Sequence, residues 1–253
     1  MITRLVRGGL AAALAVTTLT VATAAVATAV TTAVSGPNVT VTQAGNYPIF
    51  PVDSTSFSVT WKSTGTTDLT GVTRLTVDLP PGLTTNGALM YSTPYDYTFT
   101  QTVSPDGRRL EAVFTGTRAP GRSDFMKVQV SSHGTRPSGV ITVTAANKDD
   151  ADPSDNVSRY LLGSGPQAPV TPAAPAVTAL APSSGPAAGG TAVTITGTGL
   201  TNGFALFGNT PATGSCTDSA CVVTAPAGSG SVPVTLVTPG GSAATPTGFT
   251  YTP

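Results

Sequence analysis

The single histidine of this chain, His133, is the first residue to consider for chemistry. Gly134 follows it, so we expect it in a turn between strands. A nucleophile–base pair would also need a serine or cysteine and an orienting acid, and no motif such as G-x-S-x-G supplies them. We therefore expect His133 to be a solvent-facing loop residue, and we expect no catalytic residue, no cofactor and no enzyme activity.

Four carboxylates lie close together in the sequence, at Asp149, Asp150, Asp152 and Asp155. Such a cluster could supply oxygen ligands to calcium, but it lacks the EF-hand pattern and its downstream glutamate. Asp-Pro and Asp-Asn pairs are also common turn formers. We expect a solvated turn without a metal, with calcium as the alternative.

A group of aromatic residues offers a candidate binding platform. Tyr95, Tyr97 and Phe99 alternate along one face of a predicted strand, and Tyr91 lies close by. Exposed rings in a row can stack on sugars or bind protein surfaces, but the same spacing can fill a core. Both interpretations remain open, whereas Trp61 is expected in the core.

The only two cysteines, Cys216 and Cys221, have four residues between them. This spacing is too short for the disulfide that joins the two sheets of antibody domains, and the further ligands of a zinc site are missing. In an exported chain we expect a local disulfide that closes the turn between them.

The charge pattern argues against a nucleic-acid partner. The chain has 253 residues, a formal net charge of +0 and only 9% charged residues. Residues 164–253 contain neither Lys nor Arg, the side chains that contact phosphates. Their one charged residue is Asp218, so little repulsion opposes weak homo-association through residues 175–253.

The N-terminus predicts export. Arg4 and Arg7 precede a long uncharged stretch with small-residue cleavage sites between Ala24 and Ala29. We expect residues 1–29 to be a signal peptide, with an uncleaved signal anchor as the alternative. The mature protein is then secreted or extracellular, in part associated with the cell surface, without a stable membrane span.

Alternating apolar and polar residues predict the fold. Seven short strands are expected in residues 36–163, near 39–42, 57–61, 73–79, 97–101, 110–114, 126–130 and 140–145. Similar runs at 193–195 and 232–236 predict more strands in residues 175–253. The Pro-rich residues 164–174 are expected to form a semi-rigid spacer that holds the two parts apart.

Two stretches resemble known families. In residues 175–253, PSSGPAAGGTAVTITGTGL, FALFGNTPA and the terminal GFTY resemble the IPT/TIG family of immunoglobulin-like domains. This resemblance implies a small β-sandwich used for binding, spacing or dimerisation. Residues 36–163 are less specifically similar to conserved-repeat and CARDB-like domains of bacterial surface proteins, through residues 63–84 and 141–158.

We therefore predict an all-β protein of two immunoglobulin-like β-sandwich domains joined by a Pro-rich linker. The predicted function is that of an exported, non-enzymatic binding or structural module at the bacterial surface. Its partner would be a protein or a cell-envelope glycan. The alternative is a carbohydrate-binding accessory module, and exposure of the face with Tyr95, Tyr97 and Phe99 would favour it.

Overall fold

The structure, a computed structural model, describes residues 34–45, 54–91 and 97–253, and of Tyr97 only the backbone. The predicted signal peptide and Tyr95 lie outside these residues. Within the described part, no helix has the length and apolarity that a membrane span requires.

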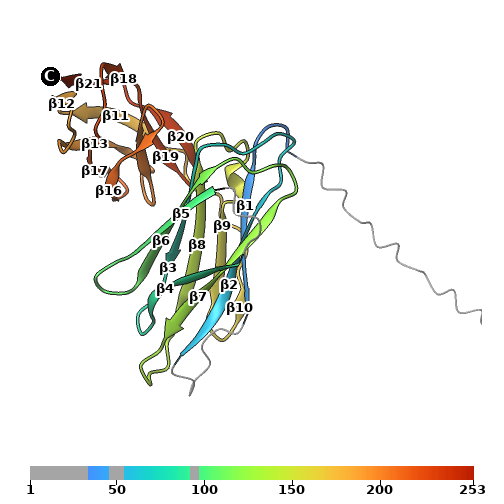
Figure 1. The fold of residues 1–253 in the computed structure, drawn as a ribbon. Helices are drawn as coiled ribbons and strands as arrows, with labels where there is room; N and C mark the ends of the chain where they lie inside the picture. The colour runs from blue at the N-terminus through green and yellow to red at the C-terminus, as the bar shows by residue number, and fades with distance from the viewer. Residues whose placement is uncertain (1–33, 46–53, 92–96) are drawn as a thin grey trace, which may run out of the picture. The chain divides into compact units, whose positions relative to one another are not determined.

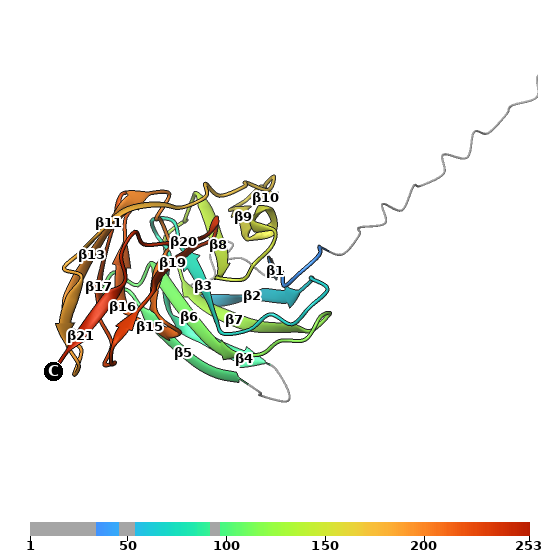
Figure 2. The ribbon, with the colours of Figure 1, turned by 90° about the horizontal axis from the view of Figure 1, so that it is seen from above.

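The strands up to residue 166 form two sheets that lie in two layers (Figures 1 and 2). We call the four-stranded sheet, in the order β1-β2-β7-β4, sheet A; the six-stranded sheet has the order β10-β9-β8-β3-β6-β5. The strands are β1 (Val39–Gly45), β2 (Ser54–Ser63), β3 (Val72–Asp78), β4 (Thr84–Tyr91), β5 (Tyr97–Val103), β6 (Arg109–Gly116), β7 (Ser123–Ser131), β8 (Val140–Asn147), β9 (Val157–Leu161) and β10 (Gly165–Pro166), with a short 3-10 helix at Pro153–Asp155 before β9.

The inward faces of these two sheets form one apolar core. Trp61 is fully buried in it, as predicted, and its ring lies 4.3 Å from the Phe114 ring. A buried ion pair supports the same region, because Arg118 Nη1 lies 2.6 Å from Asp124 Oδ2 and its guanidinium lies over the Trp61 ring. The core therefore contains a charge pair that is satisfied by close contact.

The strands after residue 175 form three small sheets, in the orders β11-β13-β17-β16, β12-β21-β18 and β15-β14-β19-β20. Their strands are β11 (Ala176–Ala181), β12 (Ser184–Pro186), β13 (Ala192–Thr198), β14 (Phe204–Phe207), β15 (Thr210–Pro211), β16 (Thr213–Cys216), β17 (Ala220–Thr224), β18 (Ser231–Val232), β19 (Val234–Thr238), β20 (Gly241–Ala244) and β21 (Phe249–Thr252). They surround a second core, which includes Ile195, Leu236 and Phe249. The all-β, immunoglobulin-like sandwich prediction is confirmed.

All seven strands predicted before residue 164 are present, but β4 and β9 were missed. In β4 the register shifts between Thr85 and Gly87, which breaks the simple alternation that the prediction relied on. Strand β9 has only five residues, all of them half-buried, so it carries no alternating pattern.

Strand β14 joins the two groups of sheets through apolar contacts. Ala205 and Phe207 face the second core, whereas Phe204 and Leu206 belong to a third apolar cluster. That cluster also includes Val72 and Ala146 from strands β3 and β8. Because consecutive strand residues point to opposite faces, β14 is buried on both sides.

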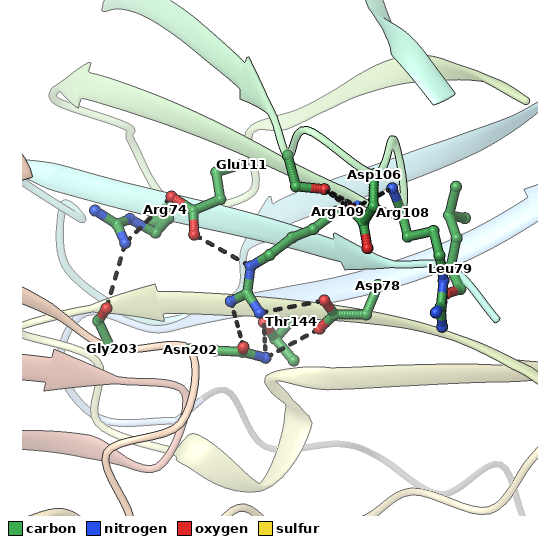
Figure 3. A network of polar contacts seen from close by, with 11 residues as sticks. Arg74, Asp78, Leu79, Asp106, Arg108, Arg109, Glu111, Thr144, Asn202 and Gly203 are labelled. Atoms are coloured by element: carbon green, nitrogen blue, oxygen red, sulfur yellow. Dashed lines mark hydrogen bonds and ion pairs between the residues drawn. The ribbon is translucent and has the colours of Figure 1, made fainter. Parts of the chain in front are cut away.

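A polar network at Asn202 adds to this junction (Figure 3). Arg109 donates a hydrogen bond from Nη2 to Asn202 Oδ1, and Asn202 Nδ2 donates to Asp78 Oδ2 at 3.4 Å. Arg109 Nη1 also lies 3.3 Å from Asp78 Oδ1. Burial raises the pKa of Asp78 above its ordinary value, and the nearby Arg109 guanidinium opposes this shift.

Arg74 makes the second polar contact of the junction. Its side chain is buried, and Nη1 donates to the Gly203 carbonyl at 3.3 Å (Figure 3). The guanidinium carbon also lies 4.7 Å from the centre of the Phe204 ring, and Nη1 lies 3.5 Å from Glu111 Oε2. Burial lowers the pKa of Arg74, and the Glu111 carboxylate opposes this shift.

These contacts correct the expectation that the Pro-rich segment holds two parts apart. The described residues from 34 onward belong to one compact unit. Part of the predicted linker is strand β10, which pairs with β9, and further along the Ala173 carbonyl lies against Gly240. A Cβ at Gly240 would come within 2.0 Å of that carbonyl oxygen, so only glycine fits there. The boundaries 36–163, 164–174 and 175–253 stay a prediction.

Candidate functional site

The outer face of sheet A exposes a pair of aromatic rings. Tyr91 on β4 pairs directly with Phe125 on β7, and both point away from the core. Their rings are stacked, with centroids 5.3 Å apart and planes 3° from parallel, although 42% of Tyr91 and 38% of Phe125 is exposed. Leu89, which is 50% exposed, lies two residues before Tyr91. Exposed apolar groups gathered in this way mark interaction surfaces.

Lys127 lies beside this pair on β7. It pairs with Leu89, and its Nζ lies 5.3 Å from the centre of the Tyr91 ring, within the range of a cation–π contact. The Lys127 ammonium group therefore makes a contact within the protein, with the Tyr91 ring.

A bulge in β4 and a side chain from the other sheet fix the edge of this face. Gly87 has a φ of 126°, and its N–H donates to Thr85 Oγ1 at 3.0 Å. The Gln101 amide of β5 accepts a hydrogen bond from Ala88 N at 2.9 Å and donates one to Ala88 O at 3.2 Å. Gln101 thus hydrogen-bonds to the backbone N–H and carbonyl of Ala88 in the edge strand β4. The bulge leaves the Asn86 side chain exposed to solvent.

Towards the opposite end of β4 and β7 from the aromatic pair, sheet A carries a polar groove of about 670 Å³. Nine of its ten lining residues have hydroxyl, amide or imidazole side chains, and none is an Asp, Glu, Lys or Arg. The lining residues are Ser54, Thr55, Ser56, Thr84, Thr85, Asn86, Gln129, Val130, Ser131 and His133. The groove is thus formed by adjoining segments of β2, β7 and β4, together with the turn after β7.

The predicted platform is divided by the structure. Tyr91 lies on the outer face of sheet A, but Phe99 is half-buried, packs against the first core and has its ring 5.1 Å from the Phe114 ring. The side chains of Tyr95 and Tyr97 lie outside the described residues. Phe99 therefore does not share an exposed surface with Tyr91.

His133 lies in a turn, as predicted, with a φ of 50°. Its Nε2 is 2.7 Å from Thr84 Oγ1, which links the turn to the start of β4. Within the described residues no carboxylate bonds to its ring, so the geometry offers a rim contact of the groove but no oriented catalytic base.

The four carboxylates considered for calcium are used separately. Asp150 Oδ1 accepts from Val39 N at 3.2 Å, Asp152 Oδ1 accepts from Ser154 N at 3.0 Å and Asp149 pairs with Lys148. Among the residues the structure describes, no three metal-binding side chains are grouped closely enough to hold an ion. The structure gives no support for a calcium site.

Asp155 has the largest pKa shift of these four carboxylates. Its Oδ2 accepts a hydrogen bond from Asn38 Nδ2 at 3.0 Å, while Oδ1 is buried with no protein partner in the described part. Burial raises its pKa to about 6, with a further contribution from the nearby Asp150 carboxylate. The charged form of Asp155 is therefore disfavoured in the fold.

Cys216 and Cys221 form a disulfide, which confirms that prediction. They pair across the β16–β17 hairpin, where the Thr217 N–H donates to the Ala220 carbonyl at 2.8 Å. The bond therefore fixes a local turn.

The sequence interpretation missed Phe125, although a signal was present. Within Ser123–Ser131 exposed and buried residues alternate, and Met126 and Val128 are buried. Phe125 lies on the same face of the strand as the exposed Lys127 and Gln129, so an aromatic residue occupies a position where a polar one is usual. That mismatch is the sequence signal for the surface.

Residues 175–251 match the IPT/TIG domain family, which confirms the resemblance for less than a third of the chain. A comparison with curated proteins gives no match. Similar solved structures include a protein of unknown function from Bacteroides thetaiotaomicron, which is 17% identical over 32% of this chain and 22% of that chain, with a TM-score of 0.29. The plexin A4 extracellular region is 16% identical over 85% of this chain and 18% of that chain, with a TM-score of 0.31. A third is a fragment of the major pilin GBS80 of Streptococcus agalactiae, which is 12% identical over 79% of this chain and 84% of that chain, with a TM-score of 0.24. The chain spans about a fifth of the first two, and at these TM-scores the likeness indicates nothing about function.

Proposed function

We propose that this protein is an exported, non-enzymatic interaction module that binds a partner at the bacterial surface through the outer face of sheet A. The observation that carries the proposal is the exposed, stacked pair of Tyr91 and Phe125 next to Leu89. Large rings held in place without being buried give contact area at little conformational cost.

Export is supported by the disulfide and by the charged N-terminus that precedes an apolar stretch. Disulfides persist in oxidising compartments, and the Cys216–Cys221 bond fits an extracellular location. The IPT/TIG match at residues 175–251 is also typical of binding or spacing modules. A non-enzymatic role agrees with the position of His133, which lacks an orienting carboxylate in the described residues.

The junction at Phe204 and Asn202 supports a role as one rigid unit. Apolar and polar contacts join the two groups of sheets there, so a force applied to one group, or a partner bound to it, would be transmitted to the other. We therefore propose that the IPT/TIG half supports the binding face rather than swinging freely on a linker.

A binding assay on cell envelopes tests this proposal. The mature protein should bind envelopes of the producing organism, and Tyr91→Ala should weaken binding about tenfold, the loss expected for one aromatic contact. Val222→Ser is the matched control, because Val222 is 55% exposed on a different sheet and should leave binding unchanged. Equal binding by wild type and Tyr91→Ala would refute the assignment of the face.

A further inference from the structure

We infer that the ligand of the outer face of sheet A is a neutral, linear polysaccharide that lies along β4 and β7. This inference rests on the proposed function and specifies the chemistry of its partner. It joins the aromatic pair and the polar groove into one site.

The two parts of the face are continuous along the strands. On β7, Phe125 pairs with Tyr91, Lys127 with Leu89, and Ser131 with Thr84 at the far end of the groove. Ser131 lies six positions after Phe125, which corresponds to about 20 Å of strand. A site of that length suits an extended chain of several sugar units rather than one small molecule.

The uncharged lining of the groove favours a neutral ligand. The groove has no charged side chain among its lining residues, and the neighbouring Lys127 contacts the Tyr91 ring. An anionic polymer would be expected to meet a cluster of Lys and Arg, as phosphate polymers do. A polyhydroxyl ligand needs no such cluster.

The polar groups of the groove match sugar hydroxyls better than a protein surface. Asn86 and Gln129 are exposed, and within the described residues their amides have no protein partner. Each amide offers both donors and an acceptor, as each sugar hydroxyl does, and Ser54 and Ser56 add hydroxyls on β2. A protein interface would have an apolar centre with a polar rim, whereas here the apolar rings lie at one end.

The rings at that end supply the remaining contact. The apolar faces of pyranose rings pack against aromatic side chains. Tyr91 and Phe125 each use one ring face to stack on the other, and Lys127 lies near the Tyr91 ring, so a sugar would contact the parts of the two rings that stay exposed. We therefore expect one sugar unit at the rings and units further along the same polymer hydrogen-bonded by Asn86 and Gln129.

Affinity electrophoresis of the full-length mature protein tests this inference. Native gels would contain soluble β-glucan, xylan or mannan as neutral polymers, and polygalacturonate as an anionic one. At least one neutral polymer should retard the protein, with polygalacturonate having no effect. Tyr91→Ala and the double variant Asn86→Ala/Gln129→Ala should each weaken retardation about tenfold, and Val222→Ser should not.

The outcomes separate this inference from the proposed function. Retardation that both site variants leave unchanged overturns the site. No retardation by any neutral polymer, together with envelope binding that still depends on Tyr91, overturns the glycan inference and keeps the binding face with a protein partner. No Tyr91-dependent binding in either assay overturns both.

Discussion

Replacing Phe204 by alanine should uncouple the two groups of sheets. Phe204 is 1% exposed, and it faces the junction cluster with Val72, Ala146 and Val237 rather than the second core. Removing a buried Phe side chain typically lowers the free energy of unfolding by about 3–5 kcal/mol. The buried guanidinium of Arg74 would also lose the ring that it covers.

Urea unfolding followed by the fluorescence of Trp61, the only tryptophan, measures the effect. Trp61 lies in the first core, far along the chain from Phe204, so its signal changes only if the junction couples the two halves. In Phe204→Ala we expect the Trp61 transition to move to lower urea and to separate from the circular-dichroism transition.

The exposed Val222 provides the control for this experiment. Val222→Ala removes apolar atoms from the same half but from its surface, and it should leave both transitions in place. A Trp61 midpoint that does not change in Phe204→Ala would refute the argument that the junction stabilises both halves.

Three further predictions follow from the sequence and the contacts. Intact mass of the exported protein should show an N-terminus between Ala25 and Val30, and full-length protein in membranes would show an anchor instead. Replacing both Cys216 and Cys221 by serine should lower the free energy of unfolding by about 2 kcal/mol without preventing folding, as urea titration can measure. Burial raises the pKa of Asp155 to about 6, above the value of about 3.9 in unfolded chains. The folded state therefore binds a proton at Asp155 more tightly than the unfolded state does. As a result, the folded state loses stability as the pH rises from about 4 through 6. Asp155→Asn should therefore be more stable than wild type at pH 8, by at most about 3 kcal/mol and less with solvent screening, and the advantage should disappear near pH 4; parallel stability profiles of the two proteins would contradict this.

The strands were predictable because their alternation is local. Phe57, Val59 and Trp61 show the buried face of β2 directly, and the structure buries all three. Strand β4 was not predictable in this way, since the bulge at Gly87 changes which residues point outward.

The junction was only partly predictable. Four consecutive apolar residues at Phe204–Phe207 indicate a strand buried on both faces, and this signal was available in the sequence. The pairing of Asn202 with Arg109 joins residues that are 93 positions apart, and no local pattern specifies such a partner. The composition of the Pro-rich segment alone therefore gave the wrong expectation of separation.

Hydroxyl-radical footprinting of the mature protein, alone and bound to cell envelopes, tests the central claim most directly. The claim predicts that binding protects Tyr91, Phe125 and Leu89, which are exposed in the free protein, and leaves Val222 and Val170 as reactive as before. Protection at Val222 with none at Tyr91 and Phe125 would contradict it, because the partner would then lie on a different sheet.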